Sequence, residues 1–153
     1  MHKKVVYKNI IMKNNDQNTN AFLIHISAFA GYLFPFGSII TPLILWQTLK
    51  DRSVFLDKQG REAVNFNISF GLYLFILSAS IFPFFFSSIF NIFDSIGNID
   101  FGTDNTFNIF GIFGIISFVS ILSIVKIALI IIAALKSKEG EAYHYPLTIK
   151  FIK

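Results

Sequence analysis

Residues 109–135 read IFGIFGIISFVSILSIVKIALIIIAAL, and Lys126 is their only charged residue. The hydrocarbon core of a bilayer is about 30 Å thick, and about 20 helical residues cross it. The stretch is long enough and apolar enough to do so. It therefore predicts a membrane-spanning helix, and the rest of the chain can be judged against it.

The composition of the whole chain agrees with this segment. Hydrophobic residues make up 54% of the 153 residues, charged residues make up 14%, and the mean hydropathy is +0.61. A soluble domain carries about 25% charged residues, and a small one leaves much of its surface exposed to water. The sequence therefore predicts one all-α, polytopic membrane bundle. Because the chain has no cysteine, it has no disulfide, thiolate metal site or cysteine nucleophile.

Two further apolar segments precede this one, at about 21–49 and 62–93, and we take the third as about 107–135. In the second, we expect a helix to start near Arg61, to span at 62–82 and to kink at Pro83, with an interfacial Phe-rich continuation. Polar sequence makes up the rest: a lead at 1–20 whose Asn-rich run 14–20 is expected to be disordered or a loose cap, a loop at 50–62, a Gly/Asn turn region at 94–108 and a tail at 136–153.

The first apolar segment is interrupted. Its helix breakers are Gly31, Pro35, Gly37 and Pro42. Proline removes a backbone donor and clashes with the preceding turn. We expect two helical pieces around a break near 34–38, in a place where protein or water covers the irregular backbone.

The charges of the polar segments predict an orientation. The lead carries Lys3, Lys4, Lys8 and Lys13 against Asp16, a net +3; the loop 50–62 carries +1, the tail +2, and the loop 94–108 carries −3. Because cytoplasmic loops are enriched in Lys and Arg, we expect the loop 50–62 and the tail to be cytoplasmic and the loop 94–108 to be external.

This orientation leaves two arrangements for the first segment. A single broken crossing, which we favour, places the basic N-terminus outside. A re-entrant hairpin keeps the N-terminus inside, but its halves, 21–36 and 38–49, reach only about 24 and 18 Å at 1.5 Å per residue, too short for two crossings.

Polar residues inside apolar segments are the candidates for function. Glu62, Asn65 and Ser69 share one helix face, directed at the bundle or at a water-filled cavity. The simpler interpretation, which we favour, makes Glu62 a first-turn acid and gives Asn65 and Ser69 interhelical hydrogen bonds. His25 is either a proton relay or ligand site or, more simply, a satisfied polar contact near the interface.

Lys126 lies about 15 Å deep by helical rise. It can pair with Glu62 or Asp57, or its stem can snorkel to the interface, which we favour. In the tail, Tyr143, His144 and Tyr145 stand between lysines, a pattern typical of the headgroup zone of anionic lipid. Since topology explains the basic charge, we expect no nucleic-acid partner.

Three runs carry a family resemblance: HISAFAGYLFPFGSIITPLILWQTLKD (25–51), FLDKQGREAVNFNISF (55–70) and AALKSKEGEAYHYPLTIKFI (133–152). They resemble the bacterial Tic20-like proteins, a domain of unknown function distantly similar to the twenty-kilodalton subunit of the chloroplast inner-envelope protein translocon. Magnetosome membrane proteins of similar pattern fall in the same broad group. The resemblance covers roughly 21–152 and implies a membrane domain, located in the bacterial inner membrane.

From these patterns we expect a non-enzymatic accessory or scaffold subunit in the cell membrane, linked to protein translocation or membrane organisation. Its partners would be the lipid bilayer and other membrane proteins or further copies of itself, with no cofactor and no metal. A small transporter or channel subunit, using the broken first helix and the stripe of Glu62, Asn65 and Ser69, is the alternative. A membrane enzyme ranks third, because the sequence shows no catalytic constellation.

Overall fold

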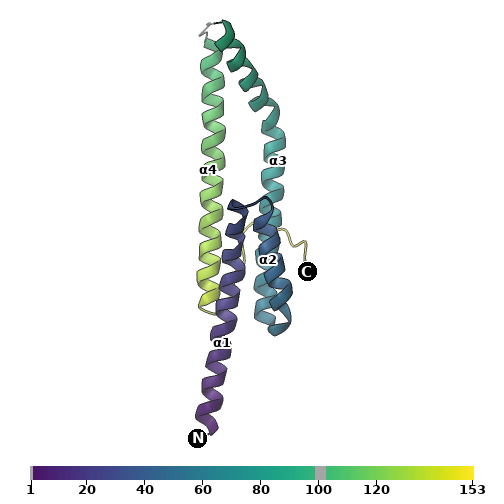
Figure 1. Cartoon of the computed structure of the whole chain (residues 1–153), viewed down its shortest axis with the longest axis vertical. Helices are drawn as coiled ribbons and strands as arrows, with labels where there is room; N and C mark the ends of the chain where they lie inside the picture. Colours follow the sequence, from purple (N-terminus) through teal and green to yellow (C-terminus); the bar gives the residue numbers. More distant parts are fainter. Residues whose placement is uncertain (1, 99–102) are drawn as a thin grey trace. The chain divides into compact units, whose positions relative to one another are not determined.

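The computed structural model describes residues 2–98 and 103–153, and no strand occurs among them. Its elements are α1 (His2–Ile26), the 3-10 helix η1 (Ser27–Tyr32), α2 (Gly37–Leu49), η2 (Lys50–Arg52), α3 (Val54–Asn98) and α4 (Thr103–Lys138) (Figure 1). The all-α prediction is confirmed. Two helices are long and apolar enough to cross a membrane, at Val54–Pro83 and Phe113–Lys138. The expected third spanning segment is not confirmed.

The chain divides into two compact units. Unit 1 comprises Met1–Gly71 and Ile127–Lys153, and unit 2 comprises Leu72–Lys126. In unit 2, the rings of Phe82, Phe86 and Phe90 follow one another along an exposed face of α3, with centroids 5.9 and 4.8 Å apart. Large exposed apolar side chains of this kind fit a lipid environment better than water.

Helix α3 begins earlier than expected, at Val54 and not near Arg61. Ser53 explains the difference, because its backbone is extended and its Oγ accepts a hydrogen bond from Leu56 N at 3.2 Å. A serine in this position satisfies one of the free N–H groups at a helix start. The helix then runs through Pro83 without ending.

One other expectation about a polar segment is wrong. The Asn-rich run 14–20 is helical, as part of α1. The expected turn region 94–108 contains the passage from α3, which ends at Asn98, to α4, which begins at Thr103, and its outer residues are helical. Its residues 99–102, including Asp100, lie outside the described part of the chain.

The first apolar segment folds back on itself as a helical hairpin. Helix α2 packs against η1 and α1, and the helices lie side by side in Figure 1. The turn between η1 and α2 falls at residues 33–36, where a break was expected, and Phe36 adopts φ 62° there. Pro42, however, lies buried inside α2 and does not end it. The chain therefore reverses direction in this segment, as a hairpin does, whereas the favoured arrangement had a single broken helix without a reversal.

Glycine makes the close approach of the two arms possible. A Cβ on Gly37 would lie 2.3 Å from Ala30 O, and a Cβ on Gly31 would lie 2.7 Å from Ser38 Cβ. Both distances are shorter than side chains tolerate. Across the same contact, Thr41 Oγ1 donates a hydrogen bond to Ser27 O at 2.7 Å.

Replacing Gly37 with alanine is therefore expected to lower the free energy of unfolding by about 1–3 kcal/mol, the usual cost of overpacking. Thermal unfolding in detergent measures it. Gly114→Ala is the control, because nothing lies within 4 Å of a Cβ at that helical position and alanine favours helix by about 1 kcal/mol. Equal unfolding temperatures for the two variants would contradict the close approach.

Candidate functional site

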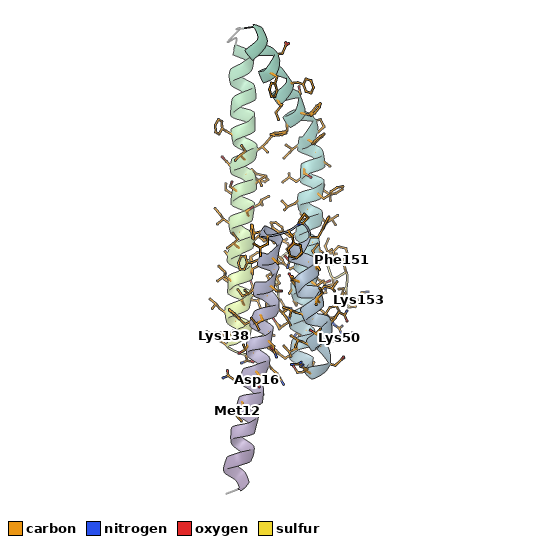
Figure 2. The ribbon with its side chains drawn as sticks, in the orientation of Figure 1. Met12, Asp16, Lys50, Lys138, Phe151 and Lys153 are labelled. Carbon is orange, nitrogen blue, oxygen red and sulfur yellow. The ribbon has the colours of Figure 1, made fainter. Side chains whose placement is uncertain are left out.

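The C-terminal segment, residues 139–153, turns away from the end of α4 and packs within unit 1. Gly140 has φ 84°, Gly140 N donates to Ser137 O at 3.1 Å, and Glu141 N donates to Lys136 O at 3.0 Å. These two bonds form a Schellman motif, the helix ending that favours glycine in the left-handed conformation. The motif ends α4 and directs the following residues toward α3. Figure 2 shows Phe151 and Lys153 beside α3.

Asn65 on α3 binds the backbone of this segment at two points. Its Nδ2 donates to Ile152 O at 2.9 Å, and its Oδ1 accepts from Ile152 N at 2.9 Å. An amide side chain offers a donor and an acceptor side by side, as a peptide group does. Asn65 therefore pairs with the main chain of Ile152 as a neighbouring β-strand would.

Ser69 and Glu62, the other members of the stripe, also contact the C-terminal segment. Ile149 N donates to Ser69 Oγ at 2.8 Å, and Ser69 Oγ donates to Asn65 O at 2.7 Å. Glu62 Oε1 lies 2.8 Å from Nδ1 of the exposed His144. The three residues share a helix face, as the sequence indicated. Asn65 and Ser69 were expected to form hydrogen bonds to other helices. They bond instead to the irregular C-terminal segment.

His25 joins three parts of unit 1. It is fully buried; its Nε2 lies 3.0 Å from Gln59 Oε1 on α3, and its Nδ1 lies 2.9 Å from the hydroxyl of Tyr145. Gln59 Oε1 also accepts hydrogen bonds from Ser137 Oγ at 3.0 Å and Tyr143 N at 3.3 Å. His25 thus makes the satisfied polar contact that the simpler interpretation described, inside the protein.

These contacts assign the tautomer of His25. A backbone N–H can only donate, so the Gln59 atom that faces Tyr143 N is its oxygen. His25 Nε2 must then carry the proton, and Nδ1 accepts the hydrogen bond of the Tyr145 hydroxyl. Burial lowers the pKa of His25 to about 4, although the Gln59 hydrogen bond and the Glu62 charge oppose the shift. His25 is therefore neutral near pH 7.

Tyr145 is the aromatic anchor of the C-terminal segment. Its ring stacks on Phe66 with centroids 4.0 Å apart and planes 7° apart, and Tyr143 contacts it edge-on at 5.2 Å. Burial raises the pKa of the Tyr145 hydroxyl, so it stays protonated and can donate to His25. The expected headgroup position is wrong for Tyr145, because the ring is buried within the protein.

Asp57 belongs to a separate polar group near the start of α3. It accepts hydrogen bonds from Trp46 Nε1 at 3.0 Å and from Arg61 Nε at 3.0 Å. Asp57 and Glu62 were the partners considered for Lys126. In the structure Asp57 contacts Trp46 and Arg61, and Glu62 contacts His144. Lys126 lies partly buried on α4 in unit 2.

The sequence did not indicate Gln59, Ser137 or Tyr145 as members of one site. The sequence placed Gln59 and Gly60 in the polar loop 50–62, but both residues lie within α3 and are buried. No spacing rule links His25 to partners 34 and 120 positions away. Ser53 was the available signal for this site. A helix start at Ser53 places Gln59 on the same helix as Asn65.

The site holds the chain's own C-terminal segment. Its side chains bind backbone N–H and C=O groups and one phenol hydroxyl, and each residue contacts the same stretch of chain. Among residues 2–98 and 103–153, no three His, Cys, Asp or Glu side chains come together as metal ligands would. The geometry supports recognition and anchoring of the C-terminal segment.

The chain matches the model of a known protein family. The model of the magnetosome magnetite crystal formation protein family matches residues 16–152. The chain belongs to this family. The assignment to the Tic20-like family is wrong, because the two families are different and the magnetosome family accounts for nearly the whole chain. The match includes both Asn65 and Ile152. No curated protein and no solved structure matches.

Proposed function

We propose that this chain is a non-enzymatic accessory protein of the magnetosome membrane that supports magnetite crystal formation. The match to the magnetosome family over residues 16–152 carries the proposal. The two apolar helices of spanning length support the membrane location. The family match gives no support to a role in protein translocation.

The contacts of the polar residues favour an accessory role over transport. A transporter would use the stripe of Glu62, Asn65 and Ser69 to line a path for an ion or solute. Their side chains instead bond to the C-terminal segment. In our proposal, α3 and α4 cross the membrane, and residues 50–62 and the C-terminal segment face the cytoplasm. The protein acts through neighbouring membrane proteins or further copies of itself.

Deletion of the gene in the magnetite-forming host tests the role. We expect magnetosome vesicles to form but to hold smaller or misshapen crystals, and we expect the wild-type gene to restore them, as measured by electron microscopy. Unchanged crystals would reject the proposal. A flux assay on the purified chain in liposomes tests the mechanism. Transport of Fe²⁺ into the liposomes would reject the accessory role in favour of a transporter.

A further inference from the structure

We propose that the hairpin of α1, η1 and α2 is a re-entrant element whose tip, residues 32–36, enters the lipid hydrocarbon from the side of Lys50 and returns to that side. The partner of this surface is the acyl chains of one leaflet. The inference concerns how the chain sits in its membrane and does not depend on the role in crystal formation.

The tip presents large apolar side chains outward. The exposed fractions are 58% for Tyr32, 85% for Leu33, 42% for Phe34 and 74% for Phe36. No Lys, Arg, Asp or Glu occurs between residues 21 and 49. A contiguous apolar patch at the end of a hairpin marks a contact with a membrane or a protein, and its depth along α3 favours lipid.

The position of the tip beside α3 gives that depth. A Cβ on Gly71 would lie 3.9 Å from Cδ1 of Ile39, which stands at the start of α2. The hairpin therefore turns at about the level of Gly71. From Glu62, the last charged residue before the apolar part of α3, helical rise to Gly71 is about 14 Å. That is about half of a 30 Å hydrocarbon core.

The irregular backbone at this depth has hydrogen-bond partners within the protein. Leu33 N donates to Ala30 O at 3.0 Å, Gly37 N donates to Phe34 O at 3.1 Å, and Thr41 Oγ1 donates to Ser27 O at 2.7 Å. Non-helical backbone is tolerated at membrane depth only when such partners replace water. The three bonds supply such partners at the turn and between the arms.

The distribution of charge agrees with a hairpin and disagrees with a crossing. The lead 1–20 carries +3, the loop 50–62 carries +1 and residues 136–153 carry +2. Figure 2 shows Asp16, Lys50 and Lys138, one from each of these segments, toward the same end of unit 1 and away from the turn at 33–36. A re-entrant hairpin places all three basic segments on one side, as basic segments of membrane proteins prefer.

Tryptophan fluorescence tests the depth, because Trp46 is the only tryptophan. In a Trp46→Phe background, Leu33→Trp is compared with Val54→Trp, since the two sites are 85% and 86% exposed. In vesicles of phosphatidylcholine brominated at mid-chain, we expect Leu33→Trp to be quenched several-fold more strongly than Val54→Trp. Equal quenching would overturn the proposal.

Cysteine labelling tests the same proposal without changing Trp46. Asn15→Cys, Asp51→Cys and Asp94→Cys each give a single, exposed thiol in a chain that has no cysteine. With a membrane-impermeant maleimide, we expect Asn15→Cys and Asp51→Cys to react from one side of the membrane and Asp94→Cys from the other. Reaction of Asn15→Cys from the side opposite to Asp51→Cys would show a crossing and would reject the hairpin.

Discussion

Replacing Asn65 with leucine is expected to detach residues 149–153 from α3, whereas the same change at Asn67 is expected to leave them in place. Asn65 holds Ile152 N and Ile152 O, each at 2.9 Å. Leucine has a similar volume but no polar atoms, so both backbone groups lose their partner. Ile152 is only partly buried, and a hydrogen bond of this kind contributes about 0.5–1.5 kcal/mol net, so the docked state should lose about 1–3 kcal/mol.

Asn67 is a matched control on the same helix. It is as deeply buried as Asn65, but its Nδ2 donates to Ala63 O, one turn earlier on α3, and its Oδ1 has no partner among residues 2–98 and 103–153. Leucine at position 67 removes a buried acceptor that is already unsatisfied. The change should therefore be nearly neutral or slightly stabilising.

Hydrogen exchange read by mass spectrometry on the C-terminal peptide measures the effect. We expect the Ile149 and Ile152 amides to exchange about tenfold faster or more in Asn65→Leu than in the wild type, and at the wild-type rate in Asn67→Leu, since 1.4 kcal/mol corresponds to a factor of ten. Wild-type exchange rates in Asn65→Leu would show that the segment is held by other contacts.

The sequence predicted the helical class and the polar stripe for a simple reason. Long apolar runs and i, i+3, i+7 spacing are local properties, and they do not depend on what the segment packs against. The stripe of Glu62, Asn65 and Ser69 was therefore visible. Its partner was not, because an extended segment bound through its backbone leaves no periodic signal in its side chains.

The hairpin was the less favoured of the two arrangements for a different reason. The breakers Gly31, Pro35, Gly37 and Pro42 predicted an interruption, but an interrupted crossing and a chain reversal require the same residues. The choice depends on whether the two arms can touch, and that is decided by the space at Gly37 beside Ala30 O. Pro42 lies inside α2, so the presence of a proline does not by itself show that the chain reverses.

Acid is expected to weaken the anchoring of Tyr145 through His25. The pKa of His25 is about 4 in the folded chain, whereas that of an exposed histidine is 6.5. Between these values the unfolded chain binds a proton that the folded chain does not, so stability falls as pH falls. The contribution is fully present above pH 6.5 and is lost by about pH 4. The difference of 2.5 pKa units corresponds to about 3 kcal/mol.

The contacts explain why protonation is unfavourable. In the neutral ring, Nε2–H donates to Gln59 and Nδ1 accepts from Tyr145. A proton on Nδ1 would put a charge in a buried site and leave the Tyr145 hydroxyl without its acceptor. Glu62 is the carboxylate whose charge favours the protonated form, but its effect is smaller than that of burial.

His25→Gln separates this effect from the titration of other groups. Glutamine does not titrate, yet its amide can donate to Gln59 and accept from Tyr145 as the neutral imidazole does. Unfolding free energies are compared between pH 7 and pH 4.5 for the wild type and His25→Gln. We expect the wild type to lose about 2 kcal/mol more than His25→Gln over this range. Parallel pH profiles for the wild type and His25→Gln would show that His25 titrates normally and that its burial does not make the anchoring of Tyr145 sensitive to acid.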